Sequence, residues 1–219
     1  MKQKLSVAEF ILSIIVIGFS FLFPHFGIIP IPFAYTIPVL LIIWLLLKKT
    51  KENFTNLGFS VKRFEWRAVA WGAVCSAMLI LFLRFVFFPL LTKIIILPEA
   101  NLDDFKSIQH NLQLYLFILL MAWLVGGFYE ELVFHGFIFT RIEKMITSKY
   151  AAPAGFFITN LIFGLYHFQQ GITGVIHAFI AGCAYQLLMM KFNRNLWYAI
   201  FIHAFYDSIA LTLIYLGYK

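Results

Sequence analysis

The sequence predicts an all-α protein, a polytopic membrane bundle of about seven transmembrane helices, with eight as the alternative count. Apolar residues make up 62% of the 219 residues and charged residues only 12%, whereas soluble domains contain about 45–50% and 25%. The apolar residues form long runs, and the Lys and Arg residues fall mainly in the short connections between the runs. These observations favour a single transmembrane domain over residues 1–219 rather than a soluble domain with one anchor.

Seven apolar runs have lengths expected of membrane helices, which rise about 1.5 Å per residue across a core of about 30 Å. They cover residues 6–24, 31–48, 68–95, 112–142, 152–167, 172–190 and 195–217. The third and fourth runs are long enough to contain an additional half-helix, which would give the eighth span.

The connections between these runs alternate in charge. The second, fourth and sixth (48–67, 141–149 and 191–194) are basic, the first and fifth lack Lys and Arg, and the third is acidic. Together with Lys2 and Lys4, this pattern predicts a cytoplasmic N-terminus and an outside C-terminus in a multi-pass cell-membrane protein. The net charge of +7 is dispersed over the connections, so we expect the lipid bilayer as a partner and no nucleic acid.

Two adjacent carboxylates, Glu130 and Glu131, lie inside the fourth run. Each costs about 2.5–3.5 kcal/mol to insert into a membrane, so each needs a partner, a proton or a function. Glu131 and His135 are spaced i, i+4 and can pair on one face of the helix. Because Glu130 points about 100° away from Glu131, the spacing predicts that Glu131 orients the site and that Glu130 is the reactive group.

The later runs supply further polar groups. In the fifth run, Asn160, Phe163 and His167 lie on one stripe of the helix, which suits a helix that faces a polar cavity. In the last run, His203 and Asp207 are spaced i, i+4 and share a face. The alternative is that these groups have no catalytic role and only form hydrogen bonds with one another between helices.

The remaining histidines, His25, His110 and His177, lie in connections or near the end of a run, and we interpret them as structural. Arg84 lies within the third run and needs a counter-charge or a water path. It is a second candidate for pairing with a buried carboxylate.

Two chemistries suit these residues. A carboxylate can act as general base on water while imidazole stabilises the oxyanion of an attacked amide. Alternatively, a divalent metal such as zinc could activate the water, held by Glu130, His167 and His203. No H-E-x-x-H or Gly-x-Ser-x-Gly motif is present, and neither cysteine is spaced to pair with a histidine, so no other site competes.

Three sequence blocks resemble those of the CAAX-protease and bacteriocin-processing (abortive-infection) intramembrane proteases. Residues 130–136, EELVFHG, are similar to the family's E-E-x-x-x-R block. Residues 163–167, FGLYH, fit its F-x-x-x-H block, and residues 203–207, HAFYD, fit its H-x-x-x-N/D block. The resemblance covers a catalytic core at about residues 112–216.

The resemblance implies a helical membrane endopeptidase with Glu130, Glu131, His167, His203 and Asp207 as catalytic residues. Glu130 would activate water, Glu131 would support it, and His203 with Asp207 would bind the oxyanion or help to hold a metal. His135, Asn160 and Phe163 would support the site. His135 stands where the family pattern has Arg, which predicts pH-sensitive activity, because an imidazole is a cation only when protonated.

We therefore predict an intramembrane protease that acts on a peptide or protein substrate, lipidated or embedded in the membrane. Peptide maturation, CAAX-type processing and bacteriocin self-immunity are the settings that the resemblance implies. The sequence leaves two alternatives open: a non-catalytic membrane immunity protein of the same fold, and a proton-coupled transporter.

Overall fold

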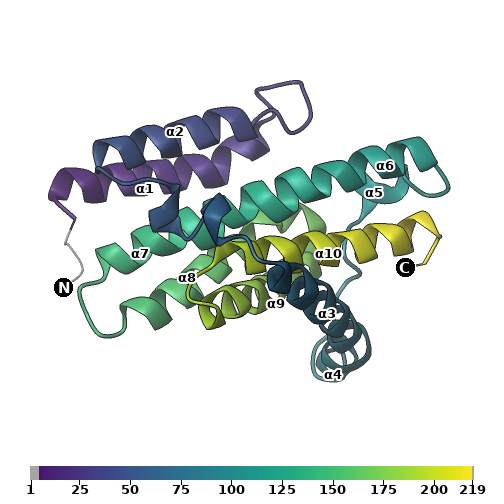
Figure 1. Ribbon diagram of the computed structural model, residues 1–219. Helices are drawn as coiled ribbons and strands as arrows, with labels where there is room; N and C mark the ends of the chain where they lie inside the picture. Colours follow the sequence, from purple (N-terminus) through teal and green to yellow (C-terminus); the bar gives the residue numbers. More distant parts are fainter. Residues whose placement is uncertain (1–4, 219) are drawn as a thin grey trace.

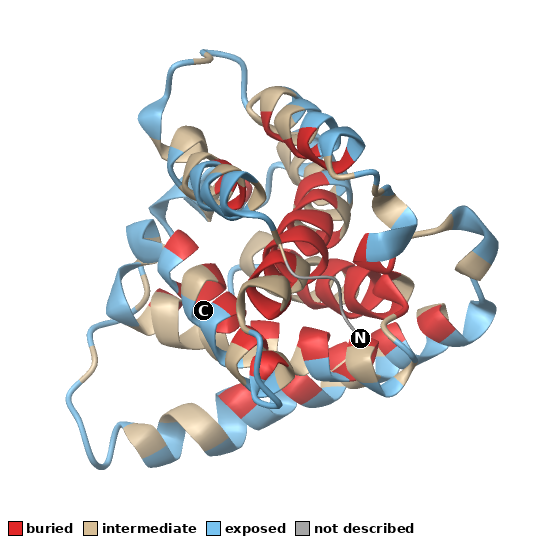
Figure 2. Cartoon of the chain, turned by 90° about the vertical axis from the view of Figure 1, so that its left-hand side faces the viewer, coloured by how far each residue is buried: buried red, intermediate tan, exposed pale blue. Residues whose placement is uncertain are grey.

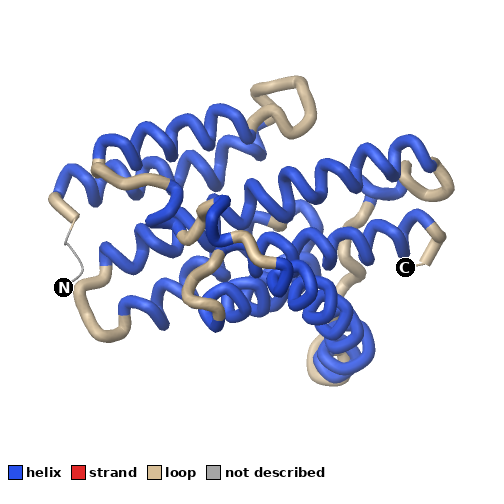
Figure 3. Tube along the Cα trace, viewed as in Figure 1, coloured by secondary structure: helices blue, strands red, loops and turns tan. Residues whose placement is uncertain are grey.

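Helices account for all regular structure in the computed structural model, which describes residues 5–218 (Figures 1 and 3). The α-helices are α1 (Val7–Leu22), α2 (Thr36–Lys49), α3 (Trp66–Phe82), α4 (Phe88–Leu91), α5 (Asp103–Lys106), α6 (Leu112–Met121), α7 (Phe139–Met145), α8 (Ala151–Tyr166), α9 (Gly171–Lys191) and α10 (Leu196–Tyr215). Short 3₁₀ turns cover Phe23–Phe26, Phe54–Leu57, Val61–Arg63 and Phe168–Gln170. The predicted all-α class is confirmed. Lys2 and Lys4, which entered the predicted topology, lie outside the described residues.

Five helices are long and apolar enough to cross a membrane within residues 5–218. They are Val7–Phe26, Trp66–Leu91, Leu112–Met145, Phe168–Lys191 and Leu196–Tyr215. The other two predicted spans, 31–48 and 152–167, form α2 and α8, of 14 and 16 residues. At 1.5 Å per residue they reach about 21 and 24 Å, short of a core of about 30 Å. The structure therefore supports a multi-pass helical bundle but not the count of seven or eight spans.

Helix α10 packs against α3, α9 and the middle of the long helix that begins with α6. Two glycines make these contacts close. A Cβ added at Gly72 of α3 would lie 2.5 Å from the Cβ of Phe201, and one at Gly127 would lie 2.8 Å from the Cβ of Ala204. Small residues allow membrane helices to approach closely and gain van der Waals contact. Buried residues accordingly concentrate in the central helices (Figure 2).

Helices α1 and α2 form a separate layer beside the bundle, drawn purple and blue in Figure 1. Ion pairs connect α7 to two loops. Arg141 Nη2 donates to Glu52 Oε2 over 2.6 Å at the end of α2, and Lys144 also pairs with Glu52. Arg194, before α10, donates to both carboxylate oxygens of Glu143 over 2.5 and 2.7 Å. These ion pairs join α7 to the loop after α2 and to the loop before α10.

Candidate active site

The two carboxylates lie in a helix with irregular winding. Between α6 and α7 the helix continues through two π-helical segments, Ala122–Glu130 and Leu132–Ile138, on either side of Glu131. A π-helical turn contains an additional residue, shifts the faces of the helix and is frequent at functional sites. The Glu130 residue is only 8% exposed and Glu131 is fully buried. Both carboxylates therefore point into the bundle rather than to the lipid.

Glu131 accepts hydrogen bonds from two histidines. His135 Nδ1 lies 2.6 Å from Glu131 Oε2, which confirms the contact expected from the i, i+4 spacing. His203 Nδ1, from α10, lies 2.8 Å from the other oxygen, Oε1. Because a carboxylate with two N–H donors is fixed in place, Glu131 connects its own helix to α10 and orients His203.

The other nitrogen of His203 faces the last predicted site residue. His203 Nε2 lies 3.4 Å from Asp207 Oδ2, one turn later in α10. The ring of Tyr185, from α9, stacks on the imidazole with centroids 4.6 Å apart. Stacking and the bond to Glu131 together fix the plane of the His203 ring.

His167 directly follows the last residue of α8 and faces Glu130. Its Nδ1–H donates to the Phe163 carbonyl over 2.9 Å, so its Nε2 is the acceptor of the neutral ring. That nitrogen lies 3.9 Å from Glu130 Oε2. The separation is too long for a direct hydrogen bond, and a water molecule near this gap could bond to both groups. Phe163 packs edge-on against His167 and His203, with centroids 4.9 and 5.8 Å away.

A cavity of about 500 Å³ reaches these groups. Glu130, His167, His203 and Asp207 all line it. The cavity extends past apolar side chains of α6 and α10 to loop residues such as Leu102 and Gln170. The sequence predicted that three separate spans would bring these groups together, and the geometry agrees with that prediction.

Several cavity residues were not predicted as functional. His25 and His177, which the sequence indicated to be structural, line the cavity. Arg84, the lower-ranked candidate for pairing with a buried carboxylate, also lines it. His177 Nε2 and the Tyr206 hydroxyl form a hydrogen bond. Among residues 5–218 no ion pair of Arg84 is present. No sequence motif marked these side chains, because each stands alone in its helix and reaches the cavity only through helix packing.

Gly126 gives room to Asp207. A Cβ at this position would lie 2.5 Å from Asp207 Oδ2 and 3.4 Å from His203 Nε2. We expect Gly126→Ala to displace the Asp207 carboxylate and to lower kcat of peptide cleavage by about tenfold or more, since small misplacements near a reacting group are costly. The thermal midpoint should change little, because a side-chain end can rotate away.

Gly18→Ala is the matched control, since nothing lies within 4 Å of a Cβ there. Activity assays and thermal melts of both variants in nanodiscs check the prediction. Equal kcat in the two variants would contradict it.

The predicted metal ligands do not fit a metal ion as their side chains lie. Within the described part of the chain, no group of three or more His, Cys, Asp or Glu could hold one. His203 directs both ring nitrogens to carboxylates, Nδ1 to Glu131 and Nε2 toward Asp207. A zinc site needs at least three ligands around one point.

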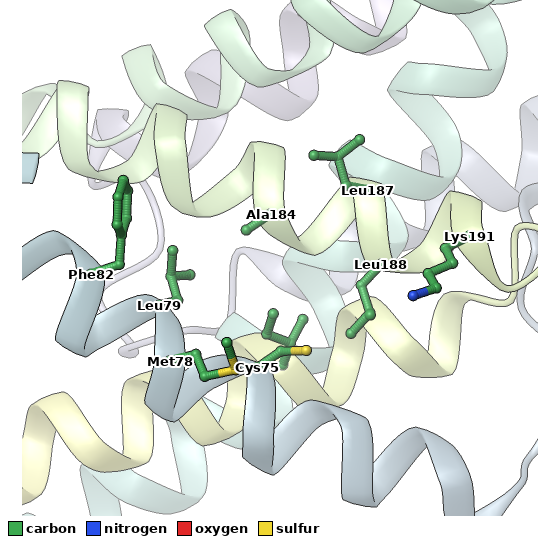
Figure 4. Close-up of a pocket in the computed structure, with 9 residues that line it drawn as sticks. Cys75, Met78, Leu79, Phe82, Ala184, Leu187, Leu188 and Lys191 are labelled. Atoms are coloured by element: carbon green, nitrogen blue, oxygen red, sulfur yellow. The ribbon is translucent and has the colours of Figure 1, made fainter.

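A second cavity, of about 480 Å³, lies between α3 and α9 (Figure 4). Its lining is apolar except at one end, where Lys191 is located, and includes Cys75 and Leu187. None of the predicted site residues lines it. Of the two cavities, the first is therefore the one that predicted site residues line.

A family match covers the helices that carry the predicted site residues. Residues 112–209 match the family model described as type II CAAX prenyl endopeptidase Rce1-like. Searches of curated proteins and of solved structures gave no match. The matched stretch contains all three sequence blocks, at residues 130–136, 163–167 and 203–207. The match confirms the resemblance to the CAAX proteases that these blocks indicated. Residues 112–209 of this membrane protein are therefore similar to the Rce1-like type II CAAX prenyl endopeptidases.

Proposed function

We propose that the protein is an intramembrane endopeptidase in which Glu130 activates a water molecule. The observation that carries the proposal is the pair formed by Glu130 and His167, 3.9 Å apart on the wall of a cavity inside the bundle. The family match supports protease activity. A carboxylate that is directed at such a gap is placed to act as a general base on a water molecule bound there.

Glu130 and His167 would position the nucleophile. The water donates one hydrogen to a Glu130 oxygen and the other to His167 Nε2, whose acceptor role follows from the Nδ1–H bond to Phe163. As the water oxygen bonds to the amide carbon, Glu130 takes the proton. It then gives that proton to the amide nitrogen as the carbon–nitrogen bond breaks, which leaves a carboxylic acid and an amine.

His203 would stabilise the oxyanion. With Nδ1–H bound to Glu131, a protonated Nε2 faces the cavity beside Asp207 and can donate to the developing negative charge. Asp207 orients this donor, and Glu131 fixes the ring from the other side. The roles assigned to Glu131, His203 and Asp207 are thus orientation and charge stabilisation, not proton removal.

The cavity suggests the class of substrate. Apolar side chains such as Met121, Val125 and Leu211 form much of its lining, which suits a peptide that carries a lipid group or lies within the membrane. We propose peptide maturation, CAAX-type processing or bacteriocin self-immunity as the biological setting. Each would present a peptide bond close to the membrane.

The test is direct cleavage by purified protein in nanodiscs. Two peptide sets are offered, one with a prenylated cysteine near the C-terminus and one with a membrane-spanning segment, and products are identified by mass spectrometry. Cleavage of either set that increases with enzyme concentration supports the proposal. Binding without cleavage would instead support the non-catalytic immunity protein, and proton uptake into proteoliposomes would support the transporter.

We expect cleavage to persist after prolonged treatment with a metal chelator. The physical reason is that Glu130 can serve as the base and both ring nitrogens of His203 already face carboxylates. A zinc-dependent peptidase treated in the same buffer shows that the chelation is effective. Loss of cleavage that returns on adding zinc would contradict this expectation and would assign the base to a metal-bound water.

A further inference from the structure

A buried polar chain extends from Glu131 in the direction away from the cavity. His135, Asn160 and Gln186 follow one another from three different helices, and each is fully buried. None of them lines the cavity. Polar groups buried in a membrane bundle are costly unless they are hydrogen-bonded, and they often mark a functional site. Substrate contact does not explain this chain.

The direction of the hydrogen bonds is fixed at Asn160. Its Nδ2 donates to the backbone carbonyl of Phe156 over 2.8 Å and to Gln186 Oε1 over 2.5 Å. A backbone carbonyl can only accept, so the side-chain nitrogen must point to it. The side-chain oxygen of Asn160 therefore points to His135, and lies 3.1 Å from its Nε2.

This orientation determines the protons on His135. Because Asn160 Oδ1 can only accept, His135 Nε2 must carry a hydrogen. The other nitrogen, Nδ1, lies 2.6 Å from the carboxylate of Glu131. When Glu131 is ionised, that nitrogen must donate too.

We propose that Asn160 and Gln186 are positioning residues that hold His135 in its doubly protonated, cationic form beside Glu131. This places a fixed positive charge at the position where the family pattern has Arg. Glu131 then stays ionised and keeps its second oxygen as the acceptor for His203. The inference rests on the proposed function only for its effect on catalysis.

The packing around this chain agrees with a specific role. A Cβ at Gly182 of α9 would lie 2.7 Å from Asn160 Oδ1, so only glycine leaves the amide in this orientation. The groups that face His135 from other helices are Asn160 and the rings of Phe163 and Tyr185, with centroids 5.3 and 6.5 Å away. Glu131, on its own helix, is the one carboxylate in contact with it within residues 5–218.

The ring nitrogens of His135 give a readout that does not depend on proteolysis. In ¹⁵N-histidine-labelled protein, with His135→Gln used for assignment, both His135 nitrogens should appear protonated at about pH 7.5, where a free imidazole is mostly neutral. In Asn160→Leu, which removes the acceptor, the Nε2 resonance should move to the unprotonated range. A wild-type His135 with one unprotonated nitrogen, or an Asn160→Leu spectrum with both protonated, would overturn the inference.

Gln186 provides a pair of variants that separates hydrogen bonding from packing. No partner of its Nε2 is present among the described residues, so Gln186→Glu keeps the acceptor for Asn160 and loses no hydrogen bond. Gln186→Leu removes the acceptor at similar size. We expect Gln186→Leu to lower kcat by about tenfold, the effect of losing a hydrogen bond in a charged network. Gln186→Glu should retain most of the activity.

Thr159→Val is the control on the neighbouring position. Thr159 is also fully buried, and its hydroxyl has no partner within the described residues, so kcat and the His135 spectrum should stay as in the wild type. Equal loss of activity in Gln186→Leu and Gln186→Glu would show that Gln186 acts through packing alone and would refute its positioning role. If no variant cleaves peptide, the spectra still test the protonation of His135.

Discussion

Glu130→Gln is expected to lower kcat/KM for peptide cleavage by about a hundredfold to ten-thousandfold, the usual contribution of a general base. The amide has the shape of the carboxylate but cannot take a proton from water. Within residues 5–218 Glu130 has no hydrogen-bonded partner and faces His167 at 3.9 Å, so the substitution breaks no hydrogen bond there. The thermal midpoint in nanodiscs should therefore be unchanged or slightly higher, since an uncharged group is easier to bury.

The matched control for this prediction is Glu99→Gln, the same change on an exposed loop residue. It should leave the cleavage rate unchanged. Single-turnover kinetics with a cleaved peptide measure the chemical step directly. A Glu130→Gln enzyme that cleaves at the wild-type rate would remove Glu130 from the mechanism, whatever its effect on binding.

The largest effect on stability is expected at Glu52. Its carboxylate is the ion-pair partner of Arg141, whose side chain is fully buried, over 2.6 Å. In Glu52→Leu the guanidinium stays buried without this counter-charge, and removal of one partner from a buried ion pair costs about 3–5 kcal/mol. Unfolding in mixed micelles, followed by circular dichroism, should show the loss.

Asp103→Leu is the contrasting control, because the Asp103–Lys106 pair is well exposed, at 66% and 75% of the side-chain surface. Exposed pairs contribute below about 1 kcal/mol. If Glu52→Leu and Asp103→Leu destabilise the protein equally, the Glu52–Arg141 contact does not fix α7 to the α1–α2 layer as the structure indicates.

Contacts within one helix could be predicted from the sequence. The i, i+4 spacings placed His135 on Glu131 and His203 near Asp207, and both contacts are present. The reason is that four residues make about one turn, so the spacing itself brings the side chains together. The winding between them was not predictable, because a π-helical turn leaves no mark in the pattern of apolar residues.

Contacts between helices were predicted only as a general convergence. The polar groups of three apolar runs indicated that Glu130, His167 and His203 share one site, but helix tilt and crossing angle decide which atoms meet. The bond from His203 to the second oxygen of Glu131 and the link from Asn160 to Gln186 therefore became visible only in the structure. His177 was missed for the same reason.

The lengths of α2 and α8 show a further limit. Their apolar runs looked like membrane spans, yet the helices stop at 14 and 16 residues. Apolar composition measures the free energy of leaving water, which is the same for a residue in lipid and for one against another helix. Composition alone cannot separate these environments.

By itself, the sequence determined a helical membrane protein, its three ordered blocks and the pairs that one turn of helix creates. These depend on composition and on local geometry, which each segment carries with it. Only the tertiary structure decided which groups share the cavity, which nitrogen of each histidine faces which oxygen, and that an amide chain lies behind Glu131. Those relations depend on close approach at glycines and on helix crossing, which are properties of the packed bundle rather than of any one segment.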